Sequence, residues 1–481
     1  MNRSAGEARV PEGSFGNELA CDLLLTGGSV VTLNDERRLV HPGAVAIEGD
    51  RIVGVGPPDE LAAYRASRTI DCRGKAILPG FVDGHNHAFQ TLGRGLGEGK
   101  PVYEWLNAFM WPYARVITTP EAAVAAKLTA IEAARAGVTA MLDDHYAPPT
   151  PAAAIAVAGA IEEVGLRGVV GRGIFGPVTD AVRHYGLPEY LFGRSTEEEL
   201  DATSEAVEAA FGRKVRIWPA PDGGFVDRDL IRRSVELARE AGIGWHTHCS
   251  ALAPDPAAYV TTYGDRPVEW LHREGLLGPL TTLAHSVWLS DAEVDAIGAT
   301  HTGVAHCPVS NMYFADGVIR LRDLRSAGAI VALGTDGNAT SQRIDLFEQM
   351  KTAALLQRIH NMDAASVFAP EALELATREG ARYLGLDAGS LQPRRLADIV
   401  VIDLERPHLQ PVHDVVPTLV HSARPSDVVM TIVGGQIIYE EGRCTRVDEA
   451  EVIAEARARS RELADRIRSV TLQPRADIHD L

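Results

Sequence analysis

The feature that most constrains the fold is a regular alternation of short apolar runs with Ala-rich or amphipathic helical segments through the middle of the chain. Eight runs have the length and composition of buried strands: AILPGFVDGHNH, VTAMLDD, LRGVVGRGIF, VRIWPAP, IGWHTHC, TTLAHSV, TGVAHCP and AIVALGTD. Helical segments such as residues 120–137 and 228–242 separate them, each closed by a glycine. This order is typical of parallel β/α units.

Two α/β architectures are compatible with such units. Eight of them over roughly 300 residues fit a (β/α)8 TIM barrel. An open doubly wound sheet instead predicts a GxGxxG turn after the first strand, where this chain carries GHNHAFQ. We therefore expect an α/β fold with a (β/α)8 barrel over residues 79–387.

The two ends of the chain have a different sequence pattern. Residues 22–56 alternate β-rich runs with Gly-containing turns, and the same pattern returns at 397–405 and 428–443. We expect residues 22–78 and 388–448 to share a small β-sandwich domain. The polar, Gly-rich residues 1–21 are predicted to be a flexible leader, and residues 449–481 a C-terminal helix and tail.

Charge and cysteine content narrow the possible partners. The formal net charge is −18 and is spread along the chain, which argues against nucleic-acid or membrane partners. The five cysteines are odd in number, with no CxxC pair, so a disulfide framework is not supported and a reducing cytoplasm is expected. No apolar run approaches the ~18 residues needed to cross a bilayer.

Polar residues end most of the apolar strands. In a strand, residues i and i+2 face the same side, so the HxH pair at the end of the first strand directs two imidazoles into one cavity. Burying many polar groups together is costly unless they bind a metal or one another. The sequence therefore predicts a divalent metal site at this edge. The strand-end residues are His85, His87, His246, His248, His285, His306 and Asp336.

The segments at these strand ends resemble the motifs of one known family. PGFVDGHNHAFQTLGRG is similar to the first-strand motif of the amidohydrolase superfamily, in its branch of aminohydrolases and chlorohydrolases that act on purines, pterins and s-triazines. AHSVWLSDAEV, VAHCPVSNMYFADG and VALGTDGNATSQRIDLFEQMKTAALLQ resemble later motifs of that branch. The resemblance covers residues 22–445, and its motifs are specific in combination.

The resemblance implies a mononuclear site with His85, His87, His248 and Asp336 as metal ligands and His285 near the reacting carbon. One divalent ion is expected, zinc first and iron second, because VRIWPAPDGG has no lysine that could bridge two metals. A bound metal lowers the pKa of its water from 15.7 to about 7. Asp336 can then carry a proton from that water to the leaving group, while His285 stabilises charge.

The chain departs from the resembled branch at one catalytic position. A glutamate usually follows the fifth-strand histidine by three residues and protonates a ring nitrogen, but HTHCSALAPD has Ala251 there. Such a donor typically contributes 10²- to 10⁴-fold. Three explanations remain open. Asp255, His145 or His306 donates instead, the substrate needs no ring protonation, or the protein is a catalytically weakened metal-binding barrel with a regulatory role.

Other residues are candidates for substrate contacts, and each has a structural alternative. Arg94 could equally pack through its stem, His145 could be a loop histidine, and His306 could belong to a structural turn. The candidates are Gln90, Arg94, Trp105, His145, His306 and Asn311.

The sequence and the resemblance together predict a metal-dependent hydrolase of C–N bonds other than peptide bonds. Its reaction is hydrolytic deamination of an amino-substituted nitrogen heterocycle by metal-bound hydroxide. Hydrolytic dechlorination and hydrolysis of a cyclic amide or amidine are the alternatives on the same scaffold. The family also implies a homodimer or larger homo-oligomer.

Overall fold

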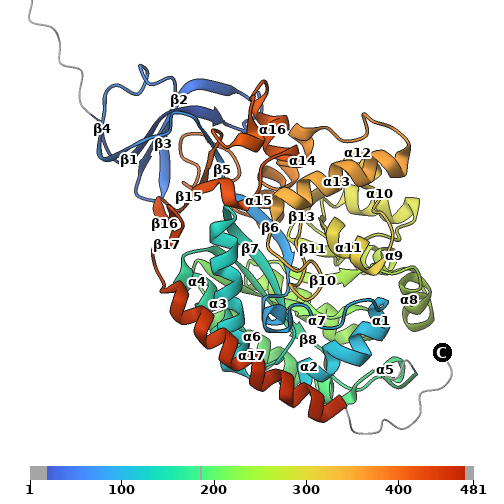
Figure 1. Cartoon of the computed structure of the whole chain (residues 1–481). Coiled ribbons are helices and arrows are strands. Elements are labelled where there is room, and N and C mark those ends of the chain that lie inside the picture. Colours follow the sequence, from blue (N-terminus) through green and yellow to red (C-terminus); the bar gives the residue numbers. More distant parts are fainter. Residues whose placement is uncertain (1–18, 185–186, 472–481) are drawn as a thin grey trace, which may run out of the picture.

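Strands from both ends of the chain form one sheet at one side of the molecule (Figure 1). The computed structural model describes residues 19–184 and 187–471. Hydrogen bonding joins nine strands in the order β17-β16-β15-β14-β5-β1-β2-β3, with β4 paired to β1. The strands are β1 (Leu19–Val31), β2 (Leu39–Glu48), β3 (Arg51–Gly56), β4 (Tyr64–Asp71), β5 (Lys75–Pro79), β14 (Ile399–Asp403), β15 (Val428–Val433), β16 (Gln436–Glu440) and β17 (Arg443–Cys444).

The two ends meet at one antiparallel pair, in which Ile77 of β5 lies opposite Val401 of β14. The expected sharing of a sheet by both ends is therefore correct. A sandwich of two separate sheets is not confirmed, because the pairing runs through all the strands as one sheet. β1 begins at Leu19, so the predicted domain start at residue 22 is too late. The rest of the predicted leader, residues 1–18, lies outside the described residues.

The turn between β15 and β16 shows why glycines occur in the hairpin turns of this sheet. Gly434 and Gly435 both have positive φ angles, 54° and 71°. This is the left-handed region that a two-residue hairpin turn needs and that side chains disfavour.

All eight predicted apolar runs are strands, and they are parallel to one another within two four-stranded sheets. Each sheet follows chain order, β6-β7-β8-β9 and β10-β11-β12-β13. β9 also contacts β10, and β13 contacts β6, so the two sheets contact each other at both of their edges. The strands are β6 (Phe81–Asn86), β7 (Val138–His145), β8 (Arg167–Ile174), β9 (Val215–Pro221), β10 (Trp245–Cys249), β11 (Thr281–His285), β12 (Gly303–His306) and β13 (Ile330–Leu333).

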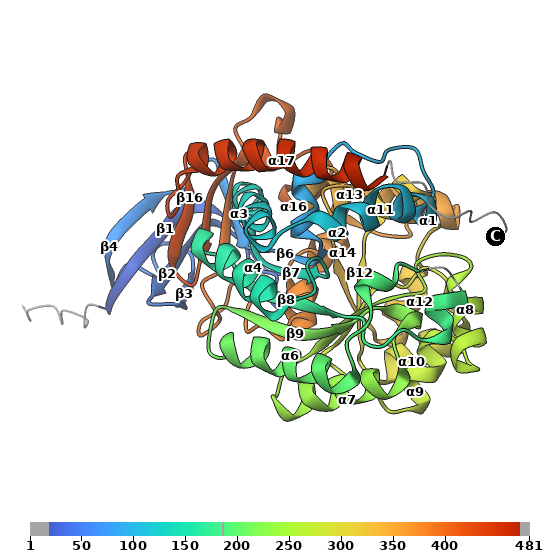
Figure 2. The same ribbon diagram turned by 90° about the horizontal axis from the view of Figure 1, so that it is seen from below.

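Helices cover the outside of these two sheets (Figures 1 and 2). The predicted helices at 120–137 and 228–242 are α3 and α7. The helices are α1 (Val102–Trp105), α2 (Trp111–Val116), α3 (Thr119–Arg135), α4 (Pro151–Val164), α5 (Asp180–His184), α6 (Thr196–Ala209), α7 (Arg228–Glu240), α8 (Asp255–Tyr263), α9 (Pro267–Arg273), α10 (Asp291–Ala299), α11 (Pro308–Phe314), α12 (Leu321–Ala327), α13 (Leu346–Asn361), α14 (Ala369–Leu375), α15 (Arg378–Tyr383), α16 (Val415–His421) and α17 (Glu449–Thr471).

The C-terminal helix α17 lies along α3, as Figure 2 shows. It starts at Glu449, where the sequence predicts a helix, and Glu449 pairs with Arg135 of α3 at 2.9 Å. Farther along, the Ser460 hydroxyl donates to the carbonyl of Leu92 at 2.8 Å. In the described part of the chain, no helix is both long enough and apolar enough to cross a membrane.

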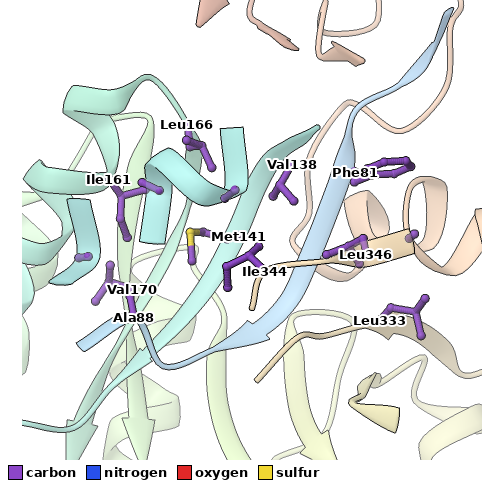
Figure 3. Close-up of a cluster of buried hydrophobic side chains, with 14 of the residues drawn as sticks. Phe81, Ala88, Val138, Met141, Ile161, Leu166, Val170, Leu333, Ile344 and Leu346 are labelled. Atoms are coloured by element: carbon purple, nitrogen blue, oxygen red, sulfur yellow. The ribbon is translucent and has the colours of Figure 1, made fainter. Parts of the chain in front are cut away.

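The core between strands and helices is densely apolar (Figure 3). Phe81 of β6 is fully buried and meets the ring of Phe347 from α13 edge to face, with ring centroids 5.0 Å apart. Val138, Met141 and Val170 are buried in the same cluster, which Figure 3 shows. Burial of each such side chain contributes about 1.5–3 kcal/mol. This packing fixes the strands whose carboxyl ends carry the site.

Candidate metal centre and active-site cavity

Three strands and the segments that follow two of them bring the predicted metal-binding residues together. His85 lies in β6 and His87 directly follows that strand, His248 lies in β10, and Asp336 follows β13. Because the strands are parallel, their carboxyl ends meet at one edge. The Oδ1 atom of Asp336 lies 3.4 Å from Nε2 of His87 and 3.7 Å from Nε2 of His85. Nε2 of His248 lies 3.2 Å from Nε2 of His87.

A hydrogen bond behind His87 leaves its Nε2 atom without a proton, whereas carboxylates lie behind His248. Nδ1 of His87 lies 2.7 Å from the carbonyl oxygen of Asp144, which can only accept, so Nδ1 carries the hydrogen. Nδ1 of His248 faces the carboxylates of Asp144 at 3.4 Å and Asp222 at 3.6 Å. Burial lowers the pKa of His248, but Asp222, Asp144 and Asp336 outweigh it and raise that pKa to about 9, so Nε2 of His248 carries a proton toward Nε2 of His87. A divalent ion between the two rings would take the place of this proton.

Nε2 of His85, like that of His87, carries no proton, and the contact with His246 is the reason. The Thr282 hydroxyl donates to the carbonyl of Trp245 at 3.0 Å, so Nδ1 of His246 is the donor to Thr282 at 2.9 Å. Nε2 of His246 then accepts from Nδ1 of His85 at 3.1 Å. Nε2 of His85 is buried, has no hydrogen-bond partner and lies within the cluster. His246 thus fixes the ring orientation and the tautomer of His85.

The ionisation states also suit a metal. Burial, reinforced by the neighbouring histidines, holds the pKa of His85 well below its ordinary value. Burial lowers the pKa of His87 to about 4. Burial opposes ionisation of Asp336, but His285, His87 and the hydrogen bond from Ser310 lower its pKa overall. A divalent ion binds neutral imidazoles and an ionised carboxylate, so these residues fit an ion that displaces the Nε2 proton of His248.

His285 differs from the three other histidines in its hydrogen bonding. The side-chain amide of Asn311 donates to its Nδ1 at 3.3 Å, and burial lowers its pKa to about 4. The neutral ring therefore carries its proton on Nε2, which lies 3.9 Å from Oδ2 of Asp336. His285 is thus a hydrogen-bond donor, which suits stabilisation of an oxygen on the reacting carbon.

Strained backbone accompanies both catalytic candidates. His285 and Asp336 have φ angles of 66° and 61°, in the left-handed region that non-glycine residues rarely adopt. The amide of Asp336 donates to the carbonyl of His85 at 2.8 Å, which ties the turn after β13 to β6. Such strain is retained at functional sites where the surroundings hold it in place.

A cavity of about 600 Å³ opens onto this cluster. His87, His248, His285 and Asp336 all line it, and so does Ala251. Most of the remaining wall is apolar or aromatic. The aromatic lining residues are Tyr103, Trp105, Trp111, Tyr146, Phe175, Phe192, Phe225, Tyr259 and Phe314.

The structure brings only some of the predicted substrate contacts to this cavity. Gln90 and Trp105 line it, whereas Asn311 lies behind the wall and contacts His285, which does line it. Arg94 is exposed and pairs with Glu132 instead. His145 and His306 are fully buried, their ring nitrogens have no hydrogen-bond partner, and neither lines the cavity. Of the three predicted replacement donors, Asp255 alone is in the wall.

Three acidic residues near the site were not predicted from the sequence. Asp144 lies near the end of β7 and reaches His87 and His248, and Asp222 follows β9 directly. The rule that polar residues end the barrel strands could have found both. Asp316 lies on the loop after α11, and no sequence signal singles it out.

Comparison with known proteins agrees with this geometry. The amidohydrolase family profile matches residues 76–438, and the imidazolonepropionase-like composite domain of bacteria matches residues 43–63. A 5-methylthioadenosine/S-adenosylhomocysteine deaminase of Natronomonas pharaonis is 36% identical, covering 92% of this chain and 98% of its own length. A 5'-deoxyadenosine deaminase of Methanococcoides burtonii is 32% identical, covering 93% and 99%.

Solved structures give the same result. The adenosine deaminase of Xanthomonas campestris with bound zinc superposes with a TM-score of 0.85 at 28% identity, covering 94% of this chain and 99% of that one. Atrazine chlorohydrolase of Arthrobacter aurescens, at 24% identity and a TM-score of 0.83 over 91% and 100%, shows a shared fold alone. The chain belongs to the amidohydrolase family and is a hydrolase of C–N bonds other than peptide bonds.

Proposed function

We propose that this protein hydrolytically deaminates a 6-aminopurine nucleoside whose sugar carries an uncharged, apolar 5' substituent. The observation that carries the proposal is one cavity in which the histidine and aspartate cluster faces a large aromatic wall. A volume of about 600 Å³ suits a nucleoside-sized ligand. The 5-methylthioadenosine/S-adenosylhomocysteine and 5'-deoxyadenosine deaminases among its relatives support this substrate class.

The charges of the cavity favour nucleosides over nucleotides. Its lining, among the described residues, contains four carboxylates, those of Asp222, Asp255, Asp316 and Asp336, and no lysine or arginine. A phosphate or carboxylate placed there would be desolvated without a cation to pair with it, which is costly. We therefore expect 5'-methylthioadenosine and 5'-deoxyadenosine to be better substrates than S-adenosylhomocysteine, whose tail ends in a zwitterionic amino acid with one carboxylate and one ammonium group.

His85, His87, His248 and Asp336 are the residues we propose to hold one divalent ion, and the bound zinc of the Xanthomonas campestris structure supports zinc. The ion supplies Lewis acidity and lowers the pKa of water toward neutrality. Asp336 moves a proton from the attacking water to the departing amine, and Nε2–H of His285 donates to the developing oxyanion.

Two structural points belong to the same proposal. The contacts of β9 with β10 and of β13 with β6 support closure of the two half-sheets into one eight-stranded barrel. The cluster then lies at the carboxyl end of that barrel. A cytoplasmic location and a homodimer or larger assembly remain predictions.

Ammonia release from a panel of nucleosides tests the function. The zinc-loaded protein is assayed with 5'-methylthioadenosine, 5'-deoxyadenosine, adenosine, S-adenosylhomocysteine and AMP. We expect the highest kcat/KM for the first two and the lowest for AMP. Absence of ammonia release from all five would overturn deamination of adenine nucleosides, and chloride release from a chlorinated triazine would then favour the dechlorination alternative.

A further inference from the structure

The wall position that carries a proton donor in the resembled deaminases is Ala251, which cannot supply a proton. Deamination of an aminopurine still requires a proton on the ring nitrogen beside the reacting carbon, because addition of water places negative charge there. The donor must therefore be another acidic side chain in the same cavity. Four carboxylates line it, and their contacts separate them.

Three of the four carboxylates have other partners. Asp336 belongs to the histidine cluster, and Asp222 faces Nδ1 of His248 at 3.6 Å. Asp255 accepts hydrogen bonds at both oxygens, from the hydroxyl of Tyr103 at 3.1 Å and from the amide of Leu252 at 2.8 Å. Burial raises the pKa of Asp255, but both bonds oppose this shift and hold the carboxyl at the start of α8, which is a structural role.

Asp316 is the exception. Asp316 is 7% exposed and lines the cavity, and in the described part of the chain its side chain accepts one hydrogen bond, a long one of 3.5 Å from the amide of Asn311. Its main chain is held firmly, since its N–H donates to the carbonyl of Asn311 at 2.9 Å and Nε1 of Trp288 donates to its carbonyl at 2.7 Å. A fixed, poorly solvated carboxyl with few stabilising contacts retains its proton more readily than an exposed one.

Asn311 links this carboxyl to the catalytic histidine. Its amide nitrogen lies 3.3 Å from Nδ1 of His285 and 3.5 Å from Oδ2 of Asp316. A single amide therefore orients the ring that faces the oxyanion and the carboxyl on the same wall. The two groups are positioned together toward one reacting centre.

We propose that Asp316 is the general acid of this enzyme, taking the place of the donor absent at Ala251. The proposal rests on the proposed deamination. Asp316 gives its proton to the ring nitrogen while the water oxygen bonds to the adjacent carbon. When the C–N bond breaks and ammonia leaves, the hydroxyl proton of the adduct returns to Asp316. The sum is amine plus water to carbonyl plus ammonia.

The test compares two leaving groups in the full-length, zinc-loaded protein. A 6-chloropurine nucleoside has a more electrophilic carbon and releases a stable anion, so it depends less on ring protonation than the 6-amino compound. We expect Asp316→Asn to lower kcat for the amino substrate by about 10²-fold or more. The fold-decrease in kcat for the chloro substrate should be at least tenfold smaller, a difference that we call the chloride-sparing pattern. Damage to the fold would lower both rates alike.

Two further variants complete the comparison. Asp323→Asn, on the exposed side of α12 where Asp323 pairs with Arg320, is the matched control and should keep wild-type rates. Ala251→Glu in the Asp316→Asn background should restore turnover of the amino substrate. Asp255→Asn should not show the chloride-sparing pattern.

The outcomes separate this proposal from the proposed function. Equal losses with both substrates in Asp316→Asn, or the chloride-sparing pattern in Asp255→Asn instead, would overturn the role of Asp316 while leaving deamination intact. If wild-type protein releases ammonia from no nucleoside, the proposed function fails. The role of Asp316 in deamination then fails with it, whereas the two results described first overturn that role alone.

Discussion

The hydroxyl of Ser310 donates a 2.5 Å hydrogen bond to Oδ2 of Asp336, while the amide of Gly337 donates to Oδ1 at 2.7 Å. These bonds fix the carboxylate plane that faces the histidines. A hydrogen bond to a charged group contributes about 1.5–3 kcal/mol. Ser310→Ala should therefore lower kcat about tenfold or more, since each 1.36 kcal/mol is tenfold in rate. Steady-state kinetics check this.

KM and metal content should change little in Ser310→Ala, because Asp336 itself remains. Ser204→Ala is the control, since Ser204 contacts only Glu208 on the outer helix α6 in the described structure. An unchanged kcat in Ser310→Ala would mean that the Gly337 amide alone orients the carboxylate.

His87→Ala should lose most of the bound metal and the activity together. Nε2 of His87 lies within 3.4 Å of both Nε2 of His248 and Oδ1 of Asp336, so its removal opens the centre of the cluster. Elemental analysis of the purified variant measures metal per chain. His272→Ala, at an exposed position of α9, should keep the wild-type metal content. Full metal retention in His87→Ala would remove this residue from the ligand set.

Gln90 and Arg94 should respond differently to substitution, although the sequence predicts both as substrate contacts. Gln90 lines the cavity and donates to the hydroxyl of Tyr146 at 3.2 Å, whereas Arg94 points to solvent and pairs with Glu132. Gln90→Ala should raise KM several-fold, and Arg94→Ala should leave it near the wild-type value. Initial-rate measurements over a range of substrate concentrations test both. A raised KM in Arg94→Ala alone would restore the prediction made from the sequence.

The strands and the cluster were predictable because their signals are local. Buried parallel strands appear as continuous apolar runs, and the polar residue that ends each run is visible beside it, as with His87 and Asp336. The sheet formed by both ends was predictable only in part, because the pairing of Ile77 with Val401 joins residues far apart in the chain. Its single-sheet form depends on that pairing.

Side chains on loops could not be placed from the sequence. Asp316 reaches the cavity because bonds from Asn311 and Trp288 hold its loop, and neither contact has a sequence signature. His145 and His306 illustrate the opposite case. They end strands as the ligands do, but both are buried in the packed wall rather than in the cavity.

A buried ion pair behind the site should be important for stability. Arg172 of β8 and Glu199 of α6 lie 2.5 Å apart with side chains 0% and 3% exposed. Removing one partner leaves the other charge buried and unpaired, which costs about 3 kcal/mol or more. Glu199→Ala should lower the free energy of unfolding by that amount in urea titrations. Glu197→Ala, also on α6, breaks an exposed pair with Arg233 of α7 and should cause no measurable change.

The pH dependence of kcat/KM should report Asp316. Burial raises its pKa to about 7, the hydrogen bond from Asn311 opposes this, and the carboxylates of Asp336 and Asp255 add to it. A general acid acts in its protonated form, which is present below this pKa and lost as the pH rises through it. For the amino substrate, kcat/KM should therefore fall as the pH rises above about 7.

Substitution identifies the group responsible for this descending limb. The limb should disappear from the residual activity of Asp316→Asn and return at a different pH in the Ala251→Glu/Asp316→Asn double variant, where another carboxyl donates. His285 faces Asp316 only through Asn311 and is already neutral at neutral pH, because burial lowers its pKa to about 4. A limb that stays at the same pH in Asp316→Asn would assign it to a different acid on the cavity wall.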